Sequence, residues 1–349
     1  MTLEASRDAY SKPNGLNDVT EKKSEDDEFL VETSRRYGLM ALFAETVYRG
    51  ELQAAARDKQ GCQYLDAGWK GDAQYGMPRA AGAAAGWARW IPTGPGEPPC
   101  MNHQNGLFYE TYVYRDEQGV MQEAVIAFRG TENRDGQAWA DWSTNVSAAI
   151  GIEPAQYRTA REHLPRLIAR LVDPAQGHPH VKIYAVGHSL GGGLAQQAGY
   201  LSAHVREVFT FNTTPVTNWT HLRRAGVIEQ GYPIIHRVYH GGEGLETPRF
   251  IATSATNARF SRHDVGVQFD RRQFAKGHSM KILACNFAQI LSKTPTTPGS
   301  HHYATDYIHT SVLKAEDAAA SQGPQRAARR VCDDDRPGQG HNGEQSKQG

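Results

Sequence analysis

The residues best suited to chemistry lie in the segment Gly187-His188-Ser189-Leu190-Gly191. The β-branched stretch before it, at 181–186, is typical of a buried strand, and the apolar spacing over 194–201 predicts a helix after it. Gly-x-Ser-x-Gly between a strand and a helix is the pattern of a nucleophile elbow, whose sharp turn strains the serine backbone. We therefore predict that Ser189 is a nucleophile at the carboxyl end of a strand. The alternative is an ordinary turn in which the hydroxyl caps the helix.

A serine hydroxyl is a weak nucleophile, so it needs a base and an acid that orients the base. In folds with this elbow, both follow the serine in the chain and the acid comes first. Glu243 is the first carboxylate after an apolar stretch at 234–239, and it lies between glycines. We predict Glu243 as the acid. Three later carboxylates are alternatives, with Glu246 the nearest: Glu246, Asp264 and Asp270.

Several histidines follow this acid position. His278 starts a predicted helix over 278–291 directly after a loop, which is a suitable place to present an imidazole, and we predict it as the base. His301 and His302, in a loop rich in Pro, Gly and Ser, are the fallback, and His263 and His309 are further histidines of the same region. His188, inside the elbow, points away from the serine by chain direction and is not predicted as the base.

An oxyanion formed during acyl transfer needs two hydrogen-bond donors. The first is the amide of Leu190, directly after the nucleophile, and the second is expected from a loop after an earlier strand. Arg129-Gly130-Thr131 follows a predicted strand at 123–128. Thr131 can offer both its amide and its hydroxyl, so we predict Leu190 and Thr131 as the oxyanion-hole residues.

Strands and helices alternate along the chain, which predicts a mainly parallel central sheet flanked by helices, as in the α/β-hydrolase fold. Apolar patterning predicts strands at 107–114, 123–128, 181–186, 205–211 and 234–239, and helices at 29–48, 154–172 and 278–291.

Three regions follow from composition: a disordered tail at 1–28, the hydrolase domain at 29–313, and a second disordered tail at 314–349. Residues 59–106 are rich in Gly, Ala and Pro, and we predict irregular cover over the domain. An alternative is a lipid-touching flap with three exposed tryptophans: Trp69, Trp87 and Trp90.

The 349 residues carry a formal net charge of zero, which makes nucleic acid a poor candidate partner. No apolar stretch is long enough to span a membrane, and the N-terminus lacks a signal-peptide pattern. We predict synthesis and residence in the cytoplasm unless a signal-independent route exports the chain.

The four cysteines, at 62, 100, 285 and 332, are irregularly spaced and form no Cys-x-x-Cys motif. This spacing favours reduced, mostly buried thiols over a disulfide framework or a zinc site. No EF-hand spacing occurs either, and the predicted chemistry requires no metal or organic cofactor.

Several separated motifs occur in one order: Ala127-Phe128-Arg129-Gly130-Thr131, Asp141-Trp142-x-x-Asn145, Gln156-Tyr157, Gly187-His188-Ser189-Leu190-Gly191-Gly192, and the strand and Pro-containing loop at 209–216. In this order and spacing they resemble the class 3 (fungal-type) lipases, over about residues 105–290.

The resemblance implies that Ser189 is the nucleophile, Thr131 an oxyanion-hole residue, and His278 the histidine near the domain's end. It puts the acid at Glu243, where the family usually has aspartate. The segment 132–140 resembles the lid position but is short and polar. The N-terminal helix and the Gly-Glu acid loop resemble bacterial members of the superfamily, some of which are similar to phospholipase toxins exported by the type VI route.

The sequence thus predicts a serine carboxylester hydrolase that cleaves lipid acyl esters through an acyl-enzyme. A phospholipase A-type antibacterial effector with the same triad is one alternative. Another is a non-catalytic lipid- or partner-binding protein on a hydrolase scaffold. The expected partners are a lipid or phospholipid substrate, transient contact with a lipid surface and, for an effector, an immunity or secretion partner.

Overall fold

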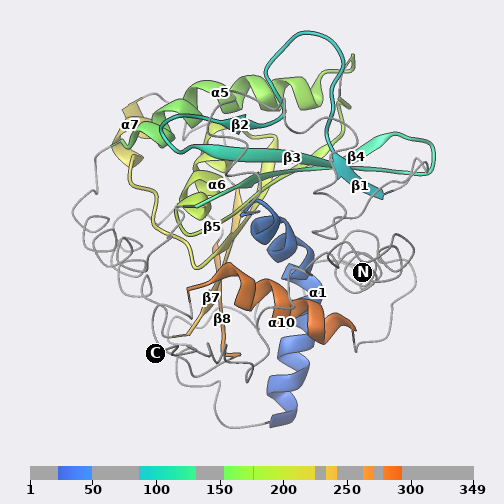
Figure 1. The fold of residues 1–349 in the computed structure, drawn as a ribbon, viewed down its shortest axis with the longest axis vertical. Helices are drawn as coiled ribbons and strands as arrows, with labels where there is room; N and C mark the ends of the chain where they lie inside the picture. The colour runs from blue at the N-terminus through green and yellow to red at the C-terminus, as the bar shows by residue number, and fades with distance from the viewer. Residues whose placement is uncertain are drawn as a thin grey trace, which may run out of the picture.

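The computed structural model describes residues 23–48, 86–130, 153–175, 177–224, 233–241, 262–269 and 278–292. Their centre is an eight-stranded sheet in the order β1-β3-β4-β5-β6-β7-β8, with β2 paired to β3 (Figure 1). The strands are β1 Gly86–Arg89, β2 Met101–Asn102, β3 Phe108–Arg115, β4 Met121–Phe128, β5 Lys182–His188, β6 Val205–Phe211, β7 Ile234–His240 and β8 Arg262–Val267.

The strands β4 to β8 are parallel to one another, whereas β1, β2 and β4 pair antiparallel with β3. The mainly parallel sheet predicted from the sequence is therefore confirmed. Parallel strands carry their carboxyl ends to one edge of the sheet, so the residues that follow β4, β5, β6 and β7 meet there.

Helices cover both faces of this sheet (Figure 1). They are α1 Lys23–Thr46, α5 Ala155–Val172, α6 Leu190–Leu201, α7 Trp219–Arg224 and α10 Met280–Ser292. Alternation along β5 produces the two cores, because successive side chains point to opposite faces. Tyr184 and Val186 pack in the cluster that includes α1 and α10, whereas Ile183 and Ala185 pack in the cluster that includes α5 and α6.

The first helix begins earlier than the apolar pattern predicts. It starts at Lys23, so the acidic run at 24–28 lies within its first turns, where negative charge is favoured by the helix dipole. The apolar residues 39–44 are all buried, which assigns this stripe to the core. The tails at 1–22 and 293–349 lie outside the described residues.

The segment predicted as irregular cover includes two short strands, β1 and β2. Trp87 and Trp90 are 0% and 2% exposed. Trp87 lies on β1, which pairs with β3, and Trp90 directly follows β1 and donates its amide to the carbonyl of Thr111 on β3 at 2.9 Å. The flap with exposed tryptophans is therefore wrong for these two residues, and Trp69 lies outside the described part of the chain.

The prediction of reduced thiols is also wrong. Cys100 and Cys285, the two cysteines in the described ranges, are both disulfide-bonded. Irregular spacing misleads here because cysteines far apart in sequence are brought together only by the tertiary fold. Each of these two cysteines is almost fully buried.

Among the described helices, none is both long and apolar enough to cross a membrane.

Candidate active site

The turn between β5 and α6 has the backbone of a nucleophile elbow. Ser189 has φ 56° and ψ −126°, and within the described ranges only Asn212 shares a positive φ among non-glycine residues. A Cβ added at Gly187 would lie 2.2 Å from the carbonyl oxygen of Gly191, so only glycine allows the chain to turn this sharply. The strained turn predicted from the sequence is present, at the edge where the parallel strands end.

The backbone of Ser189 is held from two sides. Its amide donates to the carbonyl of Phe211 at 3.0 Å, and its carbonyl accepts the amide of Thr214 at 3.1 Å. The residue is only 2% exposed. These bonds come from the end of β6 and the loop after it, so the nucleophile's position depends on two neighbouring strand ends.

The loop after β4 contacts the elbow directly. A Cβ added at Gly130 would lie 2.6 Å from the carbonyl oxygen of His188 and 3.1 Å from the Cβ of Ser189. The residue immediately before Thr131 therefore lies against the nucleophile. Thr131 itself lies outside the described residues, whereas Leu190 is the first residue of α6.

His278 lies beside the elbow, just before α10. Its carbonyl oxygen accepts hydrogen bonds from Nε2 of His188 at 2.6 Å and from Nδ2 of Asn212 at 3.2 Å. The rings of His278 and His188 lie 4.7 Å apart between centroids, and His278 is 5% exposed. The structure thus brings the predicted base next to the residue that precedes the predicted nucleophile.

Asn212 joins three parts of this site and was not identified from the sequence. Its side-chain amide donates to His278, while its Oδ1 accepts the amide of His240 at 2.8 Å. Its φ of 42° lies in the left-handed region, which asparagine tolerates better than most residues. The only signal in the sequence is an asparagine directly after a predicted strand.

The region of the predicted acid starts at the same edge of the sheet. β7 ends at His240, and the amide of Gly241 donates to the carbonyl of Val267 at 3.0 Å. Six of the predicted candidates lie outside the described residues: Glu243, Glu246, Asp270, His301, His302 and His309.

Two alternatives are excluded by the structure. Asp264 forms a two-bond ion pair with Arg237, at 2.6 Å from both Nε and Nη2, about midway along the paired strands β7 and β8. His263 is in register with His236, near the amino ends of β7 and β8 and away from the elbow edge. Neither residue belongs to the site.

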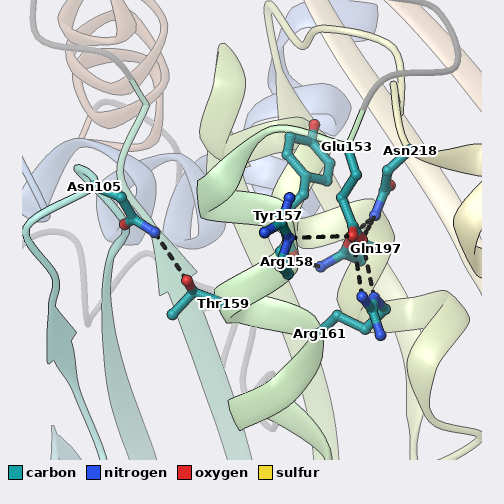
Figure 2. Close-up of polar contacts among 8 residues, drawn as sticks. All are labelled: Asn105, Glu153, Tyr157, Arg158, Thr159, Arg161, Gln197 and Asn218. Carbon is teal, nitrogen blue, oxygen red and sulfur yellow. Dashed lines mark hydrogen bonds and ion pairs between the residues drawn. The ribbon is translucent and has the colours of Figure 1, made fainter.

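A buried polar cluster supports the loop after β6 (Figure 2). Glu153 accepts two hydrogen bonds from Arg161, at 2.9 and 3.0 Å, and one from Nδ2 of Asn218 at 3.1 Å. Burial alone raises the pKa of Glu153, but the hydrogen bonds from Arg161 and Asn218 outweigh burial and lower the pKa below its usual range. Asn218 also donates to Gln197 on α6, so this carboxylate anchors helices and is not a catalytic acid.

No group of three or more His, Cys, Asp or Glu side chains suited to a metal ion occurs within the described ranges.

A strained serine between a central parallel strand and a helix, in a sheet covered by helices on both faces, defines an α/β-hydrolase. The chain belongs to the phospholipase-like family described as the Tle-like phospholipase domain, which matches residues 40–247, more than half of its length. This match spans Ser189 and Glu243 and ends before His278. The narrower class 3 lipase label stays a prediction.

One similar protein is the extracellular phospholipase A1 of Serratia liquefaciens, 31% identical over 134 residues. The match covers 38% of this chain and 36% of that protein, so the chain spans about a third of the length of this relative.

Similar solved structures include acetyl xylan esterase 1 from Thermoanaerobacterium sp. JW/SL YS485, at 11% identity and a TM-score of 0.29, covering 60% of this chain and 91% of that one. Another is S-formylglutathione hydrolase from Staphylococcus aureus, at 10% identity and a TM-score of 0.31, covering 58% and 94%. At these scores the fold assignment depends on the sheet and the elbow themselves.

Proposed function

We propose that this chain hydrolyses acyl esters of phospholipids through an acyl-enzyme on Ser189. The observation that carries the proposal is the strained backbone of Ser189 at the end of β5 in a chain of the Tle-like phospholipase family. The name of the Serratia relative, a phospholipase A1, favours phospholipid over triglyceride as the substrate.

In the proposed reaction, Oγ of Ser189 bonds to the ester carbonyl carbon while its proton passes to the imidazole of His278. The tetrahedral intermediate then expels the lysophospholipid alcohol, which takes that proton from His278. Water attacks the acyl-enzyme by the same route and releases the fatty acid. Glu243 orients the imidazole and stabilises its charged form.

The proposed oxyanion hole is supported by the bonds around the loop after β4. The amide of Gly130 already donates to the hydroxyl of Tyr48 at 2.9 Å. We therefore assign the oxyanion donor of this loop to the next residue, Thr131. The amide of Leu190 is the first of α6, and such amides have no partner within their own helix.

The substrate is tested by measuring fatty acid release from phosphatidylcholine vesicles and from triglyceride emulsions. We expect release from phospholipid to exceed release from triglyceride by about tenfold or more, which is about 1.4 kcal/mol of discrimination. Faster release from triglyceride would favour a lipase in place of a phospholipase. No release from either substrate, combined with no serine labelling by a fluorophosphonate, would contradict the proposal and favour the alternative of a non-catalytic binding protein.

We also propose that the chain acts outside the reducing cytoplasm. The disulfide-bonded Cys100 and Cys285 support this location, because such bonds persist in oxidising compartments, and the relative from Serratia is named extracellular. The resemblance to exported toxins adds a secretion partner and an immunity protein to the proposal. A chain that is harmless when directed to the periplasm would remove the immunity protein from it.

The redox state is tested by alkylating the denatured protein before and after reduction and mapping the modified peptides. We expect Cys100 and Cys285 to be modified only after reduction. Modification of either residue in unreduced protein from the native host would contradict the proposed location.

A further inference from the structure

We propose that Tyr48 is a positioning residue for the reaction at Ser189, and that it acts through His188. The inference depends on the function proposed above. Tyr48 and His188 together connect the loop that carries one oxyanion donor to the residue that serves as the base, so both are held in one arrangement around the nucleophile.

Three hydrogen bonds make this connection. The amide of Gly130 donates to the hydroxyl of Tyr48 at 2.9 Å, and that hydroxyl lies 2.8 Å from Nδ1 of His188. At the other side of the ring, Nε2 of His188 lies 2.6 Å from the carbonyl oxygen of His278. The chain of contacts thus runs from the residue before Thr131 to the backbone of the proposed base.

The direction of each bond follows from the chemistry of the groups. A carbonyl oxygen only accepts, so Nε2 of His188 carries the proton and donates to His278. In the neutral ring Nδ1 then accepts, and the Tyr48 hydroxyl must donate to it. The same hydroxyl oxygen accepts the proton of the Gly130 amide. All three hydrogen bonds run in the same direction. Consecutive hydrogen bonds of this kind polarise and strengthen one another in a low-dielectric interior.

The fold holds Tyr48 firmly enough for this role. It lies two residues after the end of α1, and its amide donates to the carbonyl of Glu45 at 2.9 Å. Its ring packs edge-on against His188, with centroids 5.5 Å apart. The preceding turns of α1 are buried in the core, and α1 and α10 lie beside each other (Figure 1). The helix before Tyr48 therefore packs against the helix that follows His278.

Glycine at 130 is a second sign that this contact is specific. A Cβ there would lie 2.5 Å from the hydroxyl oxygen of Tyr48. The loop can approach the hydroxyl this closely only because residue 130 has no side chain. Loss of the hydroxyl would leave the buried nitrogen of His188 and the Gly130 amide without these bonds.

The test is the variant Tyr48→Phe, which removes the hydroxyl and keeps the ring that packs on His188. We expect kcat for phospholipid hydrolysis to fall about 10- to 100-fold with KM within about twofold, because positioning acts on the chemical step. The rate of serine labelling by a fluorophosphonate should fall in parallel. Counting only molecules that become labelled corrects for any unfolded fraction.

The matched control is Tyr37→Phe. Tyr37 lies on α1, the helix that precedes Tyr48. Its hydroxyl contacts Nδ1 of another buried histidine, His236, at 3.3 Å, but this contact is in the core. We expect the melting temperature of this variant to fall about as much as that of Tyr48→Phe, while its kcat stays within about twofold of wild type.

The outcomes separate this inference from the proposed function. If wild-type protein neither hydrolyses phospholipid nor reacts with the fluorophosphonate, the proposed function fails. If wild type is active and Tyr48→Phe keeps the wild-type kcat and labelling rate, the Tyr48 hydroxyl has no positioning role. A kcat loss of equal size in Tyr37→Phe would also overturn the inference, because it would reduce the effect to general destabilisation.

Discussion

Replacing Ser189 by alanine is expected to lower kcat for phospholipid hydrolysis by about 10⁴-fold or more. The change removes the Oγ that forms the acyl-enzyme, and nothing else in the described site can supply it. Alanine tolerates the φ of 56° no better and no worse than serine, since both carry one Cβ. The loss should therefore be chemical, with a melting temperature close to that of wild type.

The control for this variant is Ser202→Ala, at the other end of α6. Ser202 lies outside the site, and its hydroxyl accepts only an exposed amide from His204 among the bonds described for it. This variant should keep wild-type kcat. Retention of more than a few per cent of activity in Ser189→Ala, measured on the purified variant, would contradict the assignment of the nucleophile.

Replacing His278 by glutamine is expected to lower kcat by about 10³-fold or more, because Ser189 loses the group that accepts its proton. The bonds from His188 and Asn212 reach the backbone carbonyl of residue 278, so the substitution leaves both of them in place. Glutamine keeps a polar side chain of similar length. The protein should thus stay folded while losing the base.

The fallback histidines provide the comparison. His301→Gln and His302→Gln, each made separately, should keep kcat within about threefold of wild type if His278 is the base. An active His278→Gln enzyme together with an inactive variant at 301 or 302 would move the base to that position. Measuring fluorophosphonate labelling in all three variants distinguishes a lost base from lost substrate binding.

The sequence predicts the sheet well where side-chain pattern decides the structure. β5, β6 and β7 each combine β-branched residues with burial on both faces, and the residues that start α6 carry the elbow motif. By contrast, β8 reads Arg-His-Asp-Val-Gly-Val, without an apolar alternation. It forms a strand because β7 offers it a parallel partner, which is tertiary information.

The candidate site also combines features set by local sequence with features set by tertiary contacts. The strained turn at Ser189 could be predicted, because it depends on residues that are neighbours in the sequence. The contacts of Tyr48 and Asn212 could not be predicted, because only the fold brings their partners near: Tyr48 lies 140 residues before His188, and Asn212 lies 66 residues before His278. From the sequence alone, a single tyrosine at the end of an apolar helix is predicted to be an ordinary core residue.

Peptide mapping by mass spectrometry after treatment with a fluorophosphonate tests the central claim most directly. The native protein should carry one phosphonyl group, on the oxygen of Ser189, and the adduct should be absent after denaturation before treatment and in Ser189→Ala. An unmodified native protein, or an adduct on any other residue, would contradict the account.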